Sequence, residues 1–221
     1  MNPCLLALAL LQAPLDEGAF IVREDTLEVA RESFRLKQGR LARGATGWTL
    51  STVIRYDRAR PVVVLSPLLE VGADTLPTTL QYDVADPREP VRILGELGRG
   101  RFTVRFLART AERAREFPAD RRAVVLDDSV FALYLFASWR AAAAPGTLTA
   151  IIPRGLRRET VQIQDQGLES TTVNGHPTAL RHVILTGGAN AVVHLWLDAA
   201  GRLMKVEIPS RRLTAERVPA G

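Results

Sequence analysis

The sequence predicts a mainly β protein with one central α-helix, in which a strongly curled antiparallel sheet, a half-barrel, is wrapped over the helix or lidded by it. Three observations predict this fold class. Short runs rich in Val, Ile, Thr and aromatic residues recur along most of the 221 residues, broken by Gly, Pro and Asp. One segment, 129–140, is apolar around nearly the whole helical wheel. Tight turn motifs separate the last runs, as they do between antiparallel neighbours.

The predicted strands either alternate apolar with polar residues or are short apolar runs. In one of them Arg101 and Arg105 alternate with Phe102 and Val104, which is typical of a strand with one face in water. Because 47% of the residues are hydrophobic and no linker or repeat interrupts the pattern, we expect a single domain over 18–219. The expected strands are 19–23, 26–36, 48–56, 61–65, 80–84, 91–97, 102–107, 168–173, 178–186, 190–198 and 202–208.

The apolar segment is bounded by residues that begin and end helices. Asp127 and Asp128 precede it, and an aspartate side chain can cap the free backbone N–H groups of a first helical turn. Pro145-Gly146 would end the helix. We therefore expect the only long helix over 128–141. Since it is apolar on every side, it must either plug the curled sheet or be pressed into it as a lid.

Three turns predict a four-stranded meander in the last third of the chain. Asn174-Gly175 is the favoured dipeptide of a two-residue hairpin turn, and 187–189 and 199–201 fit three-residue turns. Both faces of the resulting strands carry apolar residues, so we expect this part of the sheet to be covered on both sides. The pairs expected from these turns are Glu169–Leu180, His182–His194, Ile184–Val192, His194–Val206 and Trp196–Met204.

The first residues resemble a signal peptide. An apolar run at 5–11 is followed by Gln12-Ala13-Pro14 and then by acidic residues. We expect residues 1–13 to be removed after Ala13 and the protein to be exported to the periplasm or beyond. The alternative is a buried first strand or helix. Cleavage would remove Cys4, the one cysteine of the chain, and with it any disulfide or thiol chemistry.

The net charge of +5 raises the possibility of a nucleic-acid partner, but the pattern of charges does not favour one. The basic residues are nearly all arginines, with Lys37 and Lys205 as the only lysines, and they are interleaved along strands rather than clustered. No recognition motif accompanies them, so we expect no nucleic-acid binding. An anionic membrane surface is the more plausible charged partner of an exported protein.

Three stretches carry a resemblance to a known type of protein. They are GAFIVREDTLEVARESFRL at 18–36, VVLDDSVFALYLFA at 124–137 and VVHLWLDAAGRLMKVEIP at 192–209. In pattern and order they resemble uncharacterised bacterial secreted β-rich proteins whose architecture is similar to that of periplasmic lipoprotein carriers and outer-membrane lipoprotein receptors. The resemblance implies a bent sheet whose concave apolar side receives acyl chains. The carriers use several helices as a lid, whereas this sequence predicts one.

The sequence holds no strong catalytic motif. We find no nucleophile elbow, phosphate-binding loop or paired-histidine zinc helix, and we expect no enzyme activity, cofactor or metal. Asp127 and Asp128 could form an acid/base pair, but helix capping explains them more simply. His182, His194 and Glu169 form the one constellation with chemical potential: together on a sheet face they could hold a divalent metal, or could equally form a hydrogen-bonded polar cluster.

Our leading functional hypothesis is a non-enzymatic envelope protein that binds an apolar or lipid-like ligand between sheet and helix. One alternative is a structural or protein-interaction module whose helix fills the core. Another is a metal-assisted hydrolase that uses the two histidines. The residues predicted to contact a ligand are Phe131, Leu135, Trp139, His182, His194 and Trp196.

Overall fold

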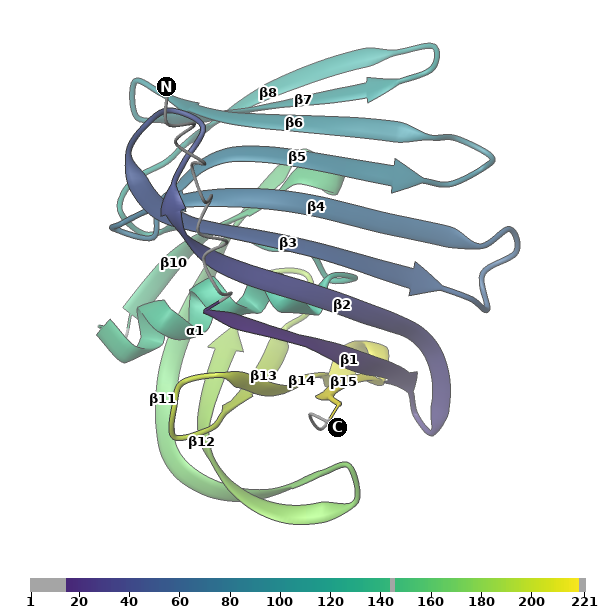
Figure 1. Ribbon diagram of the computed structural model, residues 1–221, viewed down its shortest axis with the longest axis vertical. Coiled ribbons are helices and arrows are strands. Elements are labelled where there is room, and N and C mark those ends of the chain that lie inside the picture. The colour runs from purple at the N-terminus through teal and green to yellow at the C-terminus, as the bar shows by residue number, and fades with distance from the viewer. Residues whose placement is uncertain (1–14, 144–145, 219–221) are drawn as a thin grey trace, which may run out of the picture.

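The computed structural model describes residues 15–143 and 146–218, so the predicted signal peptide lies outside the described residues. These residues form one large sheet of 15 strands, an α-helix and three short 3-10 helices (Figure 1). The strands before the helix are β1 (Asp16–Glu24), β2 (Leu27–Arg40), β3 (Thr46–Tyr56), β4 (Val63–Gly72), β5 (Pro77–Ala85), β6 (Val91–Gly98), β7 (Arg101–Ala108), β8 (Glu112–Pro118) and β9 (Ala123–Val125). The later elements are η1 (Phe131–Leu133), α1 (Tyr134–Ala143), β10 (Gly146–Ile152), η2 (Pro153–Gly155), β11 (Arg157–Val173), β12 (His176–Thr186), β13 (Val192–Leu197), β14 (Leu203–Ile208), η3 (Pro209–Arg211) and β15 (Leu213–Arg217).

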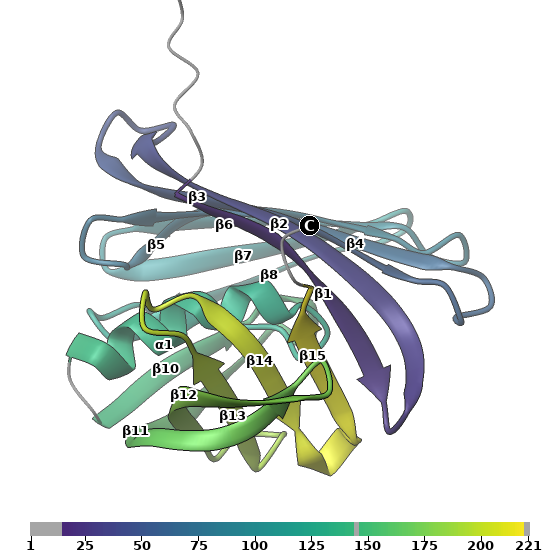
Figure 2. The same ribbon diagram turned by 60° about the horizontal axis from the view of Figure 1, so that its bottom comes forward.

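The sheet is open and almost entirely antiparallel. Its order runs from β8 through β7 and onward to β1, then through β15 to β9, so β8 and β9 are the two edges. Figure 2 shows that β3 to β7 lie on one side of α1 while β10 to β12 lie on the other. The predicted large antiparallel sheet with one buried helix is therefore confirmed. The predicted strong curl of a half-barrel is not, because the sheet is neither closed nor evenly curled, and instead two halves face each other across the helix.

The helix lies within the only parallel connection among the described strands. β9 pairs with β10 in parallel, and α1 runs between them in the chain. This crossover was not predicted, because β9 is only three residues long and fully buried, and so has no alternation. The charged edge strand β8 (ERAREFP) was not predicted for a similar reason: five of its first six positions are charged or exposed to water. Charges on an edge strand are a known way to prevent unwanted strand pairing.

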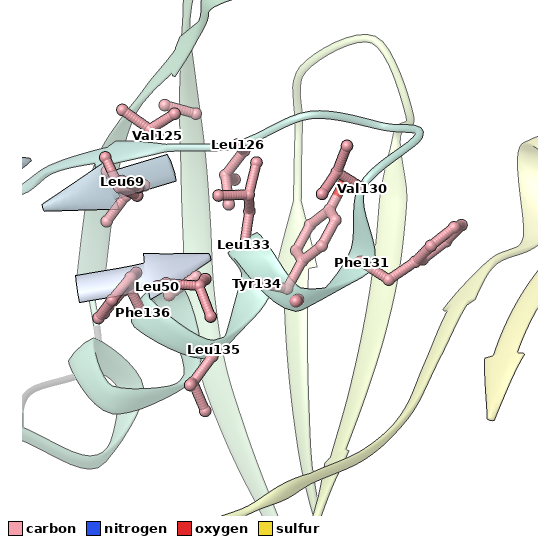
Figure 3. Close-up of a cluster of buried hydrophobic side chains, with 14 of the residues drawn as sticks. Leu50, Leu69, Val125, Leu126, Val130, Phe131, Leu133, Tyr134, Leu135 and Phe136 are labelled. Atoms are coloured by element: carbon pink, nitrogen blue, oxygen red, sulfur yellow. The ribbon is translucent and has the colours of Figure 1, made fainter. Parts of the chain in front are cut away.

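The core lies between the two halves of the sheet. Inward-facing residues alternate with exposed ones, as in β2, where Ala30, Phe34 and Leu36 are buried. The helix contributes a continuous buried stretch from Val130 to Ser138. Figure 3 shows its side chains pointing in several directions toward Leu50, Leu69 and neighbouring strands. A helix apolar on every side is thus covered on every side, as predicted. No helix in the described residues is long and apolar enough to cross a membrane.

The four-stranded antiparallel meander of β11 to β14 is confirmed, but its register differs in two places from the prediction. The turn at Asn174-Gly175 is a two-residue turn with positive φ at both positions, and Glu169 pairs with Leu180 as predicted. The second turn has five residues rather than three, because Thr186 pairs with Val192. The predicted pairing of His182 with His194, and of Ile184 with Val192, is therefore wrong: His182 pairs with Trp196 and Ile184 with His194.

The third turn has the predicted three-residue form, yet the pairing beyond it is shifted. The Asp198 N–H donates to the Arg202 carbonyl at 3.0 Å, and Gly201 has a φ of +77°. A bulge between Trp196 and Leu197 then moves the register by one residue. As a result His194 lies opposite Glu207 instead of Val206, and Trp196 lies opposite Lys205 instead of Met204.

Candidate functional site

A buried carboxylate on β2 caps the start of the helical segment. Glu32 is completely buried, and its two oxygens accept hydrogen bonds from the backbone N–H groups of Phe131 at 2.8 Å and Ala132 at 3.0 Å. The Thr52 hydroxyl donates a third at 2.7 Å. Burial raises the pKa of Glu32 to about 7, against the opposing effect of these hydrogen bonds. The cap of this segment is therefore supplied by a distant strand.

Asp127 has a different role from the predicted helix cap. It is completely buried and receives Arg154 through two nitrogens, Nε and Nη2, each at 2.6 Å. The Tyr82 hydroxyl donates to it at 3.0 Å, and the Ser129 N–H at 2.8 Å. The capping prediction for Asp127 is therefore wrong, since its one bond to a following N–H closes a local turn at Ser129, before the helical residues. Asp127 instead ties β5, the helix entry and η2 together.

The sequence held one signal for this network. In β2 the inward positions are Ala30, Glu32, Phe34 and Leu36, so a glutamate stands in a row of core residues. A carboxylate at such a position must be paired or hydrogen-bonded. The backbone N–H groups that it binds lie about 100 positions away, so no local pattern can identify them.

The predicted ligand-contacting residues of the helix are mostly core residues. Phe131 and Leu135 are buried, whereas Trp139 is half-buried in the last part of α1. The Trp139 ring makes edge-to-face contacts with Trp48 at 5.4 Å and with Phe136 at 5.3 Å between ring centroids. Beside the helix, a cavity that Tyr134 and Leu185 help to line has a volume of about 20 Å³. That is room for about one water molecule.

The three residues of the predicted polar constellation lie in one hydrogen-bonded row. His182 Nδ1 is 2.9 Å from Glu169 Oε2, and His182 Nε2 is 2.9 Å from His194 Nδ1. The row lies on the face of the sheet that points away from α1, because the alternate residues Val183 and Leu195 belong to the main core. We call these three residues the histidine row.

The geometry of the histidine row is that of a hydrogen-bond chain. The two imidazole centroids are 5.1 Å apart with planes inclined by 20°, so the rings lie edge to edge. Two nitrogens bound to one tetrahedral zinc would stand about 3.4 Å apart, given Zn–N bonds of about 2.0–2.1 Å. The observed 2.9 Å matches a hydrogen bond. Across the described residues, no group of three or more His, Cys, Asp or Glu side chains is arranged to hold a metal ion.

Burial controls the charge of the row's outer histidine. The pKa of His194 is lowered, first by burial and then by the neighbouring His182. His182 bridges Glu169 and His194 through its two ring nitrogens, and the tautomer decides which of them donates. The row can therefore orient His194. Among the described residues, these two rings are hydrogen-bonded to each other and to Glu169, and to no serine, threonine or cysteine that they could activate as a nucleophile.

The end of the β11–β12 hairpin covers the outer face next to the histidine row. Figure 1 shows this hairpin curving away from the rest of the sheet. The buried Val173, Leu180 and Trp196 form a second, smaller core with the half-buried Met204. Lys205 Nζ donates to the Thr172 carbonyl at 2.9 Å. This arrangement covers the outer face around Trp196, whereas residues 164–170 of β11 are exposed, so the meander is covered on both sides only in part.

The six predicted ligand-contacting residues consequently fall into two separate sets. Phe131, Leu135 and Trp139 belong to or pack against the main core. His182, His194 and Trp196 lie on the outer face of the sheet, where the His182 ring stacks on Trp196 with 3.9 Å between ring centroids and is hydrogen-bonded to His194. Because the sheet lies between the sets, they cannot line one ligand site.

The comparisons with known proteins address the fold. No protein-family model matches the chain, and neither does any curated protein. Among solved structures, a β-barrel-like protein of the domain-of-unknown-function family DUF1849 from Brucella abortus is similar, with a TM-score of 0.55 and 11% sequence identity. The match covers 91% of this chain and 94% of that one. At this identity the likeness concerns the fold alone: the chain shares a β-barrel-like architecture with a protein of unknown function.

Proposed function

We propose that this protein is a non-enzymatic interaction module, in which the helix fills the core and the outer surface makes the functional contacts. One observation carries the proposal: every residue from Val130 to Ala137 is buried against the sheet. Pockets for small molecules usually have volumes of about 300–1,000 Å³. The cavity beside Tyr134 has about 20 Å³, which leaves no room for an acyl chain along this part of the helix.

The geometry of the polar residues supports the non-enzymatic part of the proposal. The buried carboxylates Glu32 and Asp127 are engaged by the helix start and by Arg154, and the histidine row is engaged with itself. Each group thus has a structural partner. The metal-assisted hydrolase is less well supported, because the two histidine nitrogens are at hydrogen-bond distance rather than at the separation of two metal ligands.

A lipid-binding assay tests the proposal against the carrier hypothesis. We expect native mass spectrometry of the purified protein to detect no co-purified lipid, and a fluorescent fatty acid to show no saturable binding. Two variants are compared. Phe131→Ala shortens a buried side chain that would line the binding site of a carrier, and Leu168→Ala, the control, shortens an exposed side chain on the hairpin. Saturable binding that Phe131→Ala weakens and Leu168→Ala leaves intact would favour the carrier.

Elemental analysis tests the hydrolase alternative. We expect no stoichiometric metal in protein purified without a histidine tag. One zinc or iron ion per chain, lost in both His182→Ala and His194→Ala, would contradict the proposal. His176→Ala is the control, because that histidine lies beside the hairpin turn and is exposed.

Export remains part of the proposal, with an anionic membrane surface as a candidate contact. It is supported by the apolar run at 5–11 and by the small residue Ala13. Expressed from Met1 in a Gram-negative host, the protein should be found in the periplasm, shortened near Ala13. Intact mass spectrometry that finds cytoplasmic protein beginning at Met1 or Asn2 would contradict export.

A further inference from the structure

Arg140 stands out among the charged residues because two of its nitrogens have no partner in the described part of the chain. Its Nε and Nη2 atoms are buried, and no described residue accepts a hydrogen bond from either. Buried polar groups are nearly always hydrogen-bonded, and a guanidinium that lacks both a bond and a counter-ion is especially unfavourable. By contrast the half-buried Arg154 and the buried Arg217 each bind an aspartate through two nitrogens.

The surroundings of Arg140 do not supply the missing acceptor. Asp74 and Asp120 are close enough to act on its charge, but neither forms an ion pair with it within 4.0 Å. Each of these carboxylates is already engaged in its own turn: Asp74 accepts from the Leu76 N–H at 3.1 Å and Asp120 from the Arg122 N–H at 2.8 Å. Burial lowers the pKa of Arg140, against the opposing effect of Asp74 and Asp120.

Arg140 lies at the edge of the core. It lies in the last turn of α1, where the negative end of the helix dipole attracts a cation. This attraction does not supply hydrogen-bond acceptors to Nε and Nη2. Both Arg140 and the adjacent Trp139 are half-buried, whereas all residues from Val130 to Ser138 are buried. The Arg140 side chain is therefore partly exposed although Nε and Nη2 are buried, so an oxyanion would reach these two atoms as the side chain turns outward.

We propose that Arg140 is a binding site for an oxyanion, a carboxylate or phosphate group presented by the partner of this module. A guanidinium offers a planar fork of N–H donors that matches the two oxygens of such a group. Trp139, in contact with Trp48, provides an adjoining apolar wall. The inference rests on the proposed function, since it names the chemistry of the partner, but the filled core does not depend on it.

Small anions test the site directly. Wild-type protein is titrated with acetate and, separately, with inorganic phosphate against chloride at constant ionic strength, while tryptophan fluorescence and the thermal midpoint are recorded. We expect saturable stabilisation, weakened at least about tenfold in Arg140→Gln. The matched control is Arg158→Gln, which changes an exposed arginine and should leave the titration unchanged. A stronger response to acetate identifies a carboxylate partner, and a stronger response to phosphate a phosphorylated one.

The stability of the variant without oxyanions supplies a second readout. Since Arg140→Gln removes an unpaired buried charge, we expect it to be at least as stable as the wild type in chloride buffer. Equal anion stabilisation in wild type and Arg140→Gln, no saturation in the wild type, or clear destabilisation of Arg140→Gln in chloride would each overturn the site. None of these results would affect the filled core, which the fatty-acid assay tests separately.

Discussion

The two ends of the helical segment differ in how their polar groups are satisfied. At its start, Glu32 caps the first N–H groups and Asp127 binds Arg154, so the buried charges there have partners from distant strands. At its end, Arg140 keeps two buried nitrogens without a partner among the described residues. Removing one partner of a buried ion pair is strongly destabilising, and a buried charge that has no partner is itself costly. The start of the helical segment therefore has a structural role, whereas its end, at Arg140, is suited to binding.

The largest effect is expected in the middle of the helical segment. Phe131→Ala should destabilise the protein by about 3–5 kcal/mol and Leu135→Ala by about 2–5 kcal/mol, because both side chains are buried in the main core. Trp139→Ala should cost less, since Trp139 is half-buried. Urea denaturation measures all three. If Trp139→Ala were the least stable of the three variants, the end of the helix would be as important for stability as its middle, which would contradict the comparison.

Breaking the network at the start of the segment should be nearly as costly. Asp127→Ala leaves Arg154 without its main counter-ion and Tyr82 without its acceptor, so we expect a loss of about 3 kcal/mol in the free energy of unfolding. Asp128→Ala is the matched control, because its longer contact with Arg154, at 3.3 Å, is the weaker one. Equal losses in both variants would show that Asp127 is not the anchor of the network.

The pH dependence of stability should depend on Glu32. Its pKa is 4.5 in an unfolded chain and about 7 in the folded protein, so between these values the folded state holds more protons. The contribution of Glu32 is therefore complete below pH 4.5 and is lost as the pH rises through 7, by up to about 3 kcal/mol. Glu32→Gln should remove this slope from the pH profile of the unfolding free energy. A slope that survives in the variant would assign it to other groups.

The histidine row should produce a smaller effect of opposite sign. Because the pKa of His194 is lowered in the folded state, the unfolded chain binds more protons below the ordinary value of 6.5. His194 therefore opposes folding as the pH falls below that value. His194→Gln should relieve this loss in a Glu32→Gln background, where the larger slope is absent. Denaturation curves at pH 5 and pH 7 measure it.

The sequence predicted those features that depend on local residue patterns. The all-round apolar segment predicted a buried helix, and Asn174-Gly175 predicted its hairpin, because each needs only neighbouring residues. The five-residue loop after Thr186 and the bulge beside Trp196 were not predictable, since turn length and bulges depend on how the strands pack.

The polar sites depended on tertiary structure in the same way. Glu32 caps the helical segment because the fold brings it beside residues that are distant in the sequence. The lack of an acceptor for Arg140 likewise depends on which residues the fold places around it. The histidine row could be predicted as a group, because diagonal neighbours on adjacent strands tolerate a two-residue change of register without changing face.

Electron density around the helix in an experimental structure, from protein purified out of its expression host, would test the central claim most directly. The account predicts that Phe131, Leu135 and Phe136 pack against the sheet with only protein atoms around them, and that any density of non-protein origin near the helix lies beside Arg140. An elongated density between the helix and the sheet, running along Phe131 and Leu135, would contradict the filled core and return the protein to the carriers of apolar ligands.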